Sequence, residues 1–358
     1  MTVKVSKPAI NIREKLSELQ KPSGIAGEAL LRADTPQEAF EEIGAGRKNL
    51  LINGDFRVSQ RGTYTTAVTA THNVLYLDRW TIRTAGSLTA TLTHILPHAA
   101  SHPYPNISNS VKLIATNTTS GMLRLLQRVE GRMTSRTLTF SSWVKSDNSN
   151  ARIFCYRQGT GDRVASEPHS GNGSWEKLTV TYTDNASTAN NLYFDIAIAS
   201  EAFGNATITT GDYIEASEAQ LELGKVATPF EHRSYGEELA LCQRYFYKAP
   251  SSNGYMYSML GVHATSGEIQ YYPPATMRTA PSVSLHDASP YWEVFPWNTV
   301  GNNSIHITSI HSGHMSLDGH GQVGVFFSGT TGSYVTPNLV RGLNYAIRAD
   351  FIAFSAEL

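Results

Sequence analysis

Short stretches of alternating apolar and polar residues recur between residues 49 and 233, separated by turn clusters rich in Gly, Asn, Asp and Ser. Residues 137–144 and 176–182 alternate most clearly, which predicts strands with one buried and one exposed face. Strands are expected at residues 49–53, 76–83, 88–95, 110–115, 123–129, 137–145, 151–157, 177–183, 192–198, 206–209 and 213–223. Their number and spacing favour an antiparallel β-sandwich of two sheets, of the jelly-roll type.

Two segments, residues 49–56 and 218–231, bracket this region. Each combines a short apolar run with Gly or Pro and a neighbouring carboxylate, and we interpret them as the first and last strands of one sandwich. Trp80 follows the apolar run at residues 75–77 and is predicted to lie in the core.

The pattern before residue 49 is helical. An amphipathic helix is predicted on the spacing of Ile12, Leu16 and Leu19, and a second over residues 35–46, which open with a capping box. Helices of about two turns are marginal alone and need a partner surface. We favour a docking or trimer-nucleating segment over residues 1–48; the alternative is a helical cap on the chain's own sheet.

A helix is also predicted at residues 236–246, because Leu239, Cys242 and Phe246 fall on one stripe. After it, strands are expected at residues 255–263, 267–272, 282–287, 291–297, 304–310, 313–318, 321–328 and 343–355. The chain is therefore predicted to be mainly β, with a helical N-terminal segment (1–48), a sandwich (49–233), and a linker helix with a smaller C-terminal β domain (234–358).

Composition narrows the functional classes. The 358 residues carry a formal charge of −1, and positive and negative residues are interspersed along the chain. No stripe of basic residues is present that could neutralise a row of phosphates, which argues against nucleic-acid binding. No apolar window approaches the roughly 20 residues of a membrane span, and no export signal precedes the first helix. Charged residues are only 16%, below an average of about 25%, so neutral polar faces are expected, suited either to sugar hydroxyls or simply to solubility.

The chain has two cysteines, Cys155 and Cys242, each within an apolar run. Such positions predict buried free thiols rather than a disulfide, so the chain can fold in a reducing cytoplasm.

Both bracketing segments resemble a known family. The run from Asn49 to Phe56, with Arg-Gly at 61–62 and Leu-Asp-Arg-Trp at 77–80, resembles the opening of a sandwich module of tail-fibre and other appendage proteins of tailed bacteriophages. The closing motif, Gln-Leu-Glu-Leu-Gly at 220–224 with Ala-Thr-Pro-Phe-Glu at 227–231 and Leu-Cys-Gln-Arg-Tyr-Phe at 241–246, is also similar to that group. The matching stretches span roughly residues 7–83 and 213–250.

The module of that family is similar to carbohydrate-binding modules with a β-jelly-roll. The resemblance implies a virion protein, assembled as a homotrimer in the host cytoplasm. Its residues 1–48 would contact other virion structural proteins, and its β domains would face bacterial surface polysaccharide. We expect a non-enzymatic bacteriophage tail fibre or similar appendage that attaches to host glycans. The alternatives are a purely structural head-fibre, decoration or adaptor protein, and a glycan depolymerase.

Such modules bind sugars by stacking aromatic rings on pyranose faces, and the sandwich offers four candidates: Tyr156, Trp175, Trp143 and Tyr193. We favour Tyr156 and Trp175, since Trp175 follows the loop at residues 171–174 and loops often carry binding.

The same resemblance implies a structural calcium site where the first and last strands meet. Asn53, Asp55 and Glu218 are the candidate oxygen ligands. Arg57 stands where such modules often have an acidic residue, so the alternative is a hydrogen-bonded turn without metal.

No catalytic pair stands out. The carboxylates of the sandwich are scattered, no Gly-x-Ser-x-Gly elbow or phosphate-binding Gly-rich loop is present, and no Cys/His metal signature occurs. We therefore expect no enzymatic activity and no cofactor other than the calcium considered above.

Overall fold

The structure is a computed structural model. It describes residues 48–96, 109–129, 135–157, 159, 162–185, 191–248, 273–279, 281–282 and 353–357, together with the backbone of further C-terminal strands. The predicted helices of residues 1–48, with Ile12, Leu16 and Leu19, lie outside the described residues, as does the strand predicted at 313–318.

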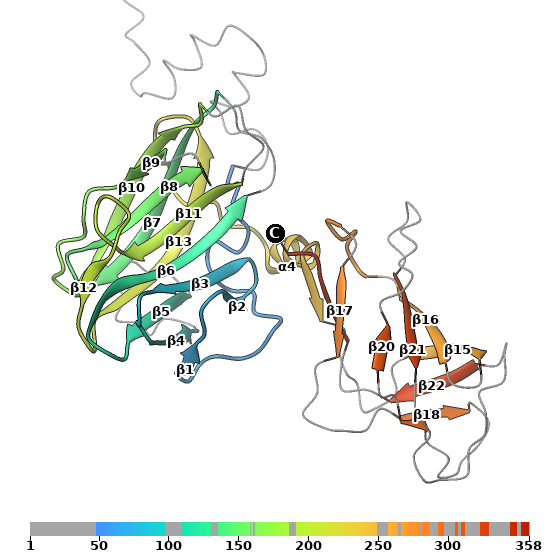
Figure 1. Cartoon of the computed structure of the whole chain (residues 1–358). Coiled ribbons are helices and arrows are strands. Elements are labelled where there is room, and N and C mark those ends of the chain that lie inside the picture. The colour runs from blue at the N-terminus through green and yellow to red at the C-terminus, as the bar shows by residue number, and fades with distance from the viewer. Residues whose placement is uncertain are drawn as a thin grey trace, which may run out of the picture.

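Two antiparallel sheets stack face to face in the region between the bracketing segments (Figure 1). In spatial order, the first sheet contains β1 (Val68–Ala70), β4 (Ala90–Ile95), β5 (Ser110–Ala115), β13 (Tyr213–Leu223), β7 (Thr137–Ser146) and β10 (Trp175–Thr183). The second contains β2 (Val74–Leu77), β3 (Trp80–Ala85), β6 (Thr119–Val129), β11 (Leu192–Ile198), β8 (Ala151–Arg157) and β9 (Arg163–Ala165), with β12 (Ala206–Ile208) beside β6.

The core lies between these sheets and follows from the alternation of the strands. In β10, Leu178, Val180 and Tyr182 are buried between exposed threonines. Phe140 of β7 meets Phe194 of β11 edge to face at 5.7 Å, which joins the two sheets. The predicted fold class is confirmed: the chain is mainly β, with an antiparallel sandwich and, among the described residues, one short helix.

Several local predictions are confirmed. Trp80 is fully buried, and Cys155 and Cys242 are buried free thiols. The strand predicted at 76–83 is wrong, because the chain turns at Asp78 and Arg79 and forms two strands, β2 and β3. Arg79 takes a φ of 72°, a conformation that favours glycine, so the turn lacks the glycine that would have marked it in the sequence.

The first bracketing segment is not a strand, although it does lie against β13 as its predicted neighbour. Leu50 N donates to Leu221 O at 2.8 Å, and Ala219 N donates to Gly54 O at 2.8 Å. Near these contacts the register of β13 against β7 shifts between residues 217 and 220, so β13 itself is irregular here. The two segments therefore meet through isolated bonds.

Gly54 is fixed by this approach. A Cβ atom there would lie 2.2 Å from Ala219 O, which is backbone and cannot swing away. We expect Gly54→Ala to lower the free energy of unfolding by roughly 1–3 kcal/mol, as overpacking does. Gly236→Ala is the matched control, because nothing lies within 4 Å of its Cβ position. Chemical denaturation measures both; equal stability of the two variants would contradict the contact.

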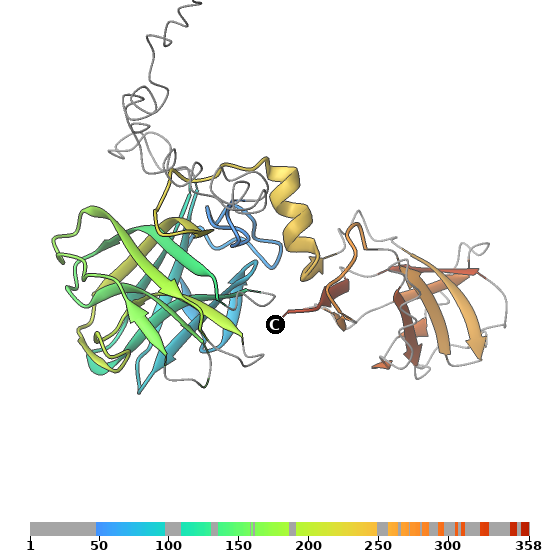
Figure 2. The ribbon, with the colours of Figure 1, turned by 90° about the horizontal axis from the view of Figure 1, so that it is seen from above.

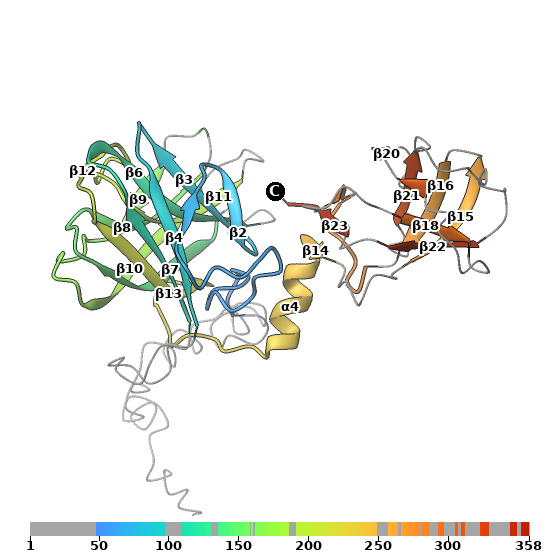
Figure 3. The same cartoon turned by 90° about the horizontal axis from the view of Figure 1, so that it is seen from below.

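Helix α4 (Tyr235–Gln243) leads out of the sandwich, as predicted. Ser234 caps it by accepting a hydrogen bond from Glu237 N. Cys242 and Tyr245 pack on Ile52 and Val58 in a small apolar cluster, so α4 covers the opening segment (Figures 2 and 3).

Two further antiparallel sheets follow α4. The first contains β14 (Phe246–Lys248), β23 (Ile352–Ser355) and β17 (Ser282–Leu285). The second contains β19 (Ile305–His306), β18 (Glu293–Pro296), β22 (Asn344–Arg348), β15 (Tyr257–His263), β16 (Ser266–Tyr271), β21 (Val323–Ser328) and β20 (Ser309–His311). The single strand predicted at 343–355 is therefore wrong, since β22 and β23 belong to different sheets.

The C-terminal segment attaches to the sandwich through charge. Glu357 forms ion pairs with Arg61, at 3.0 Å, and with Arg79. Arg61 also contacts Asp78 at 2.9 Å, and its guanidinium lies 3.7 Å from the ring centroid of Phe246. These groups form one network at the turn between β2 and β3.

Burial raises the pKa of Asp78 to about 6, opposed by Arg61. A raised carboxyl pKa means that the folded state holds the proton more tightly, so stability falls as pH rises between the unfolded and folded pKa values. We expect the unfolding free energy of the wild type, taken relative to that of Asp78→Asn, to drop by on the order of 2 kcal/mol from pH 4 to pH 6. Urea titrations across this range measure it, and a difference that grows with pH would contradict the assignment.

Candidate functional site

The four aromatic residues proposed for sugar binding fall into two pairs on different sheets. Tyr156 of β8 lies opposite Tyr193 of β11. Trp143 of β7 lies opposite Lys177 of β10, and Trp175 lies opposite Lys145. All four point away from the core, because the alternate residues of their strands fill it. The two pairs therefore occupy the two outer faces of the sandwich and cannot form one site.

The tyrosine pair is stacked. The rings of Tyr156 and Tyr193 are 5.1 Å apart with an interplanar angle of 13°, and the residues are 8% and 3% exposed. Phe203, from the turn after β11, packs at 4.8 Å on Tyr156. Leu126 and Phe154 complete an apolar cluster that is separate from the core.

An aromatic cluster is unusual on a sheet face that points away from the core, where polar residues are the rule. Strand β11 accounts for it, since all its residues are buried and it does not alternate like β10. A buried aromatic cluster on an outer sheet face indicates either packing against the chain itself or the binding of a ligand.

A buried ion pair lies at the centre of this face. Arg124 Nε donates to Asp195 Oδ2 at 2.7 Å, and Arg124 Nη2 donates to the Tyr156 hydroxyl at 2.6 Å. Burial raises the pKa of Asp195, and Arg124 opposes this shift. Burial also raises the pKa of Tyr156, so its hydroxyl stays protonated at neutral pH. Asp195 Oδ1 accepts no hydrogen bond from the part of the chain that is described.

Three more arginines lie near the rings, and a fourth, Arg152, lies on the same sheet face. The guanidinium carbons of Arg83 and Arg128 lie 6.0 and 5.8 Å from the Tyr193 centroid, and that of Arg163 lies 5.3 Å from Phe203. Arg152 donates to Ser166 O at 2.8 Å. We call this set the arginine–tyrosine face; its members are Arg83, Arg124, Arg128, Arg152, Tyr156, Arg163, Tyr193, Asp195 and Phe203.

The sequence-based reasoning missed the arginines and Asp195 as parts of a binding face. Arg124 and Arg128 share one face of β6, and Tyr193 and Asp195 share one face of β11. The members of each pair are an even number of positions apart, so the sequence alone could show that they lie on the same face of their strand. The sequence could not predict the register that places these two strands side by side, because that register depends on pairing between segments about 70 residues apart in the chain.

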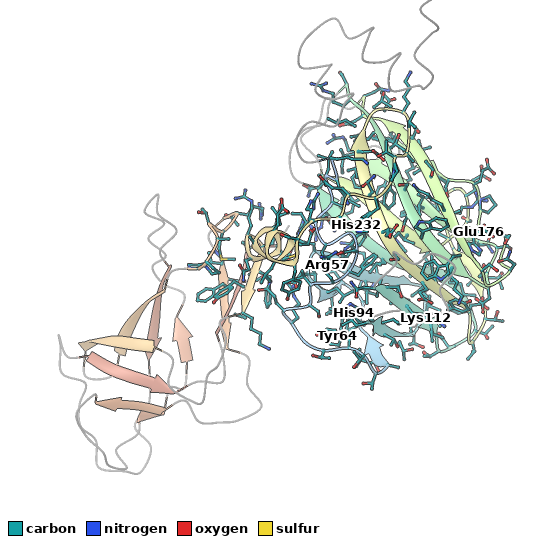
Figure 4. All side chains as sticks on the ribbon, turned by 180° about the vertical axis from the view of Figure 1, so that it is seen from behind. Arg57, Tyr64, His94, Lys112, Glu176 and His232 are labelled. Carbon is teal, nitrogen blue, oxygen red and sulfur yellow. The ribbon has the colours of Figure 1, made fainter. Side chains whose placement is uncertain are left out.

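The opposite outer face carries a row of aromatic, basic and acidic side chains. Trp175, Lys145, Glu215 and Lys112 lie opposite one another across β10, β7, β13 and β5. Lys112 Nζ lies 4.0 Å above the Tyr213 ring, and Figure 4 labels Lys112 on this sheet. Trp143 and Trp175 are half-buried here, and their role in sugar binding stays a prediction.

The three candidate calcium ligands do not fit a metal. The Asp55 carboxylate is held by Arg57 Nε, and the Asn53 amide bonds Val58 and the carbonyl of Asp78. Among the described residues no group of three or more His, Cys, Asp and Glu side chains gathers as a metal site would require.

Glu218 does lie near Asp55, but it also lies near two basic side chains, His232 and Lys177. Burial raises its pKa, His232 and Lys177 lower it, and Asp55 raises it further. In Figure 4, Arg57 and His232 lie close to each other near α4. Basic side chains therefore stand where a cation would bind, so the turn is held by hydrogen bonds and ion pairs.

The Arg124–Asp195 pair offers a test of the site's construction. We expect Asp195→Asn to lower the unfolding free energy by about 3 kcal/mol or more, because it leaves Arg124 as a buried, uncompensated charge. Glu201→Gln is the control: Glu201 is 82% exposed and 3.9 Å from Arg152, so we expect a change within about 0.5 kcal/mol. Thermal and urea unfolding measure both, and similar effects would show that Asp195 does not hold Arg124 in place.

No family model matches this chain, and no curated protein matches it. Among solved structures, the enzymatically active domain of tailspike protein 4 of bacteriophage CBA120 is 14% identical, with a TM-score of 0.32, over 49% of this chain and 21% of that chain. The family 11 carbohydrate-binding module of the cellulase Lic26A-Cel5E of Clostridium thermocellum is 11% identical, with a TM-score of 0.30, over 47% and 99%. TmCBM61, in complex with β-1,4-galactotriose, is 11% identical, with a TM-score of 0.30, over 49% and 99%. Because these similarities are weak and partial, any argument about ligand binding must come from the residues of this chain.

No helix in the described residues is both long enough and apolar enough to cross a membrane.

Proposed function

We propose that this chain is a non-enzymatic glycan-binding protein of a bacteriophage fibre or similar virion appendage, and that the arginine–tyrosine face binds bacterial surface polysaccharide. The observation that supports binding is the cluster of stacked tyrosines, arginines and one carboxylate on an outer sheet face. Guanidinium N–H groups are donors whose hydrogen bonds the oxygen atoms of a polysaccharide can accept, and the buried tyrosines and Asp195 hold the arginines in position beneath them.

The location on a virion rests on the bracketing motifs and their resemblance to phage appendage modules. A homotrimer would present three copies of the face on one fibre. Weak binding at each copy would then be strengthened by multivalency, since the second and third contacts form at high effective concentration.

The absence of catalysis is also part of the proposal. The acidic groups near this sheet have structural partners: Arg157 Nε donates to Asp184 at 2.9 Å, and the Tyr182 hydroxyl donates to Asp162 at 3.1 Å. A glycosidase needs two carboxyl groups facing the same glycosidic bond. Asp195, with its ion pair to Arg124, is the single carboxylate within the arginine–tyrosine face.

One observation favours a second candidate, a purely structural appendage protein. Tyr156 and Tyr193 are almost fully buried, and Arg124 already donates hydrogen bonds to Asp195 and to the Tyr156 hydroxyl. A face that satisfies itself in this way is also what packing alone would produce.

Binding by the full-length chain to an array of bacterial polysaccharides tests the proposal. We expect Tyr193→Ala to weaken binding by at least about tenfold, which corresponds to about 1.4 kcal/mol. Trp175→Ala is the control on the opposite outer face and should leave binding unchanged. Phe203→Ala is a second test variant of the same face. Phe203 is half-buried, so its removal disturbs the sandwich less than the removal of the buried Tyr193.

Each outcome separates the candidates. If the wild type binds no polysaccharide, the structural role replaces the glycan-binding one. If Trp175→Ala abolishes binding and Tyr193→Ala does not, the site lies on the other sheet. Circular dichroism of each variant confirms that the sandwich is folded.

A further inference from the structure

We propose that the arginine–tyrosine face selects anionic glycans, that is, polysaccharides bearing carboxylate, phosphate or sulfate groups. This inference rests on the proposed glycan-binding function and adds the chemical class of ligand.

The arginines are arranged in rows by strand register. Arg83 of β3 lies opposite Arg124 of β6, and Arg152 of β8 lies in the same row through Ala197 of β11. Adjacent strands are about 4.8 Å apart, and like charges directly opposite one another are destabilising. A second row places Arg128 and Arg163 on either side of the two tyrosines.

Charge on this face is not balanced by its own carboxylates. Asp195 neutralises Arg124, and Glu201, 82% exposed, lies 3.9 Å from Arg152. Within the described part of the chain, no carboxylate lies at ion-pair distance from Arg83, Arg128 or Arg163. The chain as a whole carries a formal charge of −1, so this excess of positive charge is local.

The tyrosines hold the arginines in a binding geometry. A guanidinium that rests on an aromatic ring keeps its N–H groups at its edge, where they can meet an anion in a bidentate fork. Arg83 and Arg128 both approach the Tyr193 ring, and both are half-exposed. The nearly complete burial of the tyrosines is consistent with this arrangement, since arginine edges rather than rings meet the ligand.

The opposite outer face has a smaller excess of positive charge at its centre. Lys112 and Lys145 both lie opposite Glu215 in the strand register, so two cations flank a carboxylate. As far as the described residues extend, the arginine–tyrosine face therefore offers an acidic polymer guanidinium groups that lack a carboxylate partner; Arg83 Nε donates to the neutral amide of Asn73, at 3.1 Å.

The experiment uses the full-length chain and an array of acidic and neutral polysaccharides, at physiological salt. The strongest acidic ligand is then tested beside its own charge-neutralised form, made by carboxyl reduction or by removal of phosphate or sulfate. We expect acidic members alone to bind, neutralisation to weaken binding at least about tenfold, and the affinity to fall as salt rises.

Two variants locate the effect. Arg83→Gln and Arg128→Gln should each weaken binding to the acidic ligand about tenfold, the loss expected for one charge-assisted hydrogen bond. Lys112→Gln is matched to them, because Lys112 also lies over a tyrosine ring but on the opposite sheet, and it should have no effect. All three side chains are partly exposed, so their removal leaves the fold intact.

The outcomes distinguish anionic specificity from the proposed glycan-binding function on which it rests. Binding to neutral glycans, or unchanged binding after charge removal, overturns the anionic specificity and leaves glycan binding in place. Equal losses from Lys112→Gln and Arg83→Gln overturn the assignment to this face. No binding to any polysaccharide removes the proposed function, and the specificity with it.

Discussion

The sandwich depends on how the buried backbone of its opening segment is satisfied. That segment forms no strand, so its N–H and C=O groups need partners from elsewhere. Gln127 of β6 bonds both polar groups of Ile52, at 2.9 and 2.7 Å, and the Asn49 side chain bonds Ala219 and Leu221 of β13. A side chain of the second sheet and the main chain of β13 in the first sheet thus both bond this short segment, which closes the sandwich at this end.

The closing segment supplies the charged half of the same arrangement. Glu231 accepts hydrogen bonds from the backbone of Lys48 and Asn49, and Glu238 of α4 accepts one from Asn53. Arg233 bonds both carboxylates, so it is fixed between the sandwich and the helix. The two motifs that bracket the sequence are therefore the parts of one polar network, and the position of α4 follows from it.

The sequence predicted the fold more fully than the site, for a physical reason. The strands at 110–115, 151–157, 192–198 and 213–223 agree with β5, β8, β11 and β13, because alternation and apolar runs are local properties. Residues 49–53 are as apolar as a strand, yet side chains from distant segments bond them, and no local pattern encodes that. Likewise, parity along a strand shows which residues share a face, but not which sheet the strand joins. Tyr156 and Trp175 were for that reason grouped together although they lie on different outer faces.

The ion pairs of Glu357 have a consequence for the order of events during synthesis. Arg79 lies buried in the turn between β2 and β3, and its carboxylate partner is 278 residues further along the chain. A nascent sandwich has every strand available long before that carboxylate emerges from the ribosome. Until then, among the described carboxylates, Arg61 has Asp78 as its ion-pair partner and Arg79 has none. The ion pairs that fix this turn therefore form only after residue 357 has been synthesised, so a turn of the first β domain is completed by a carboxylate that follows the C-terminal strands.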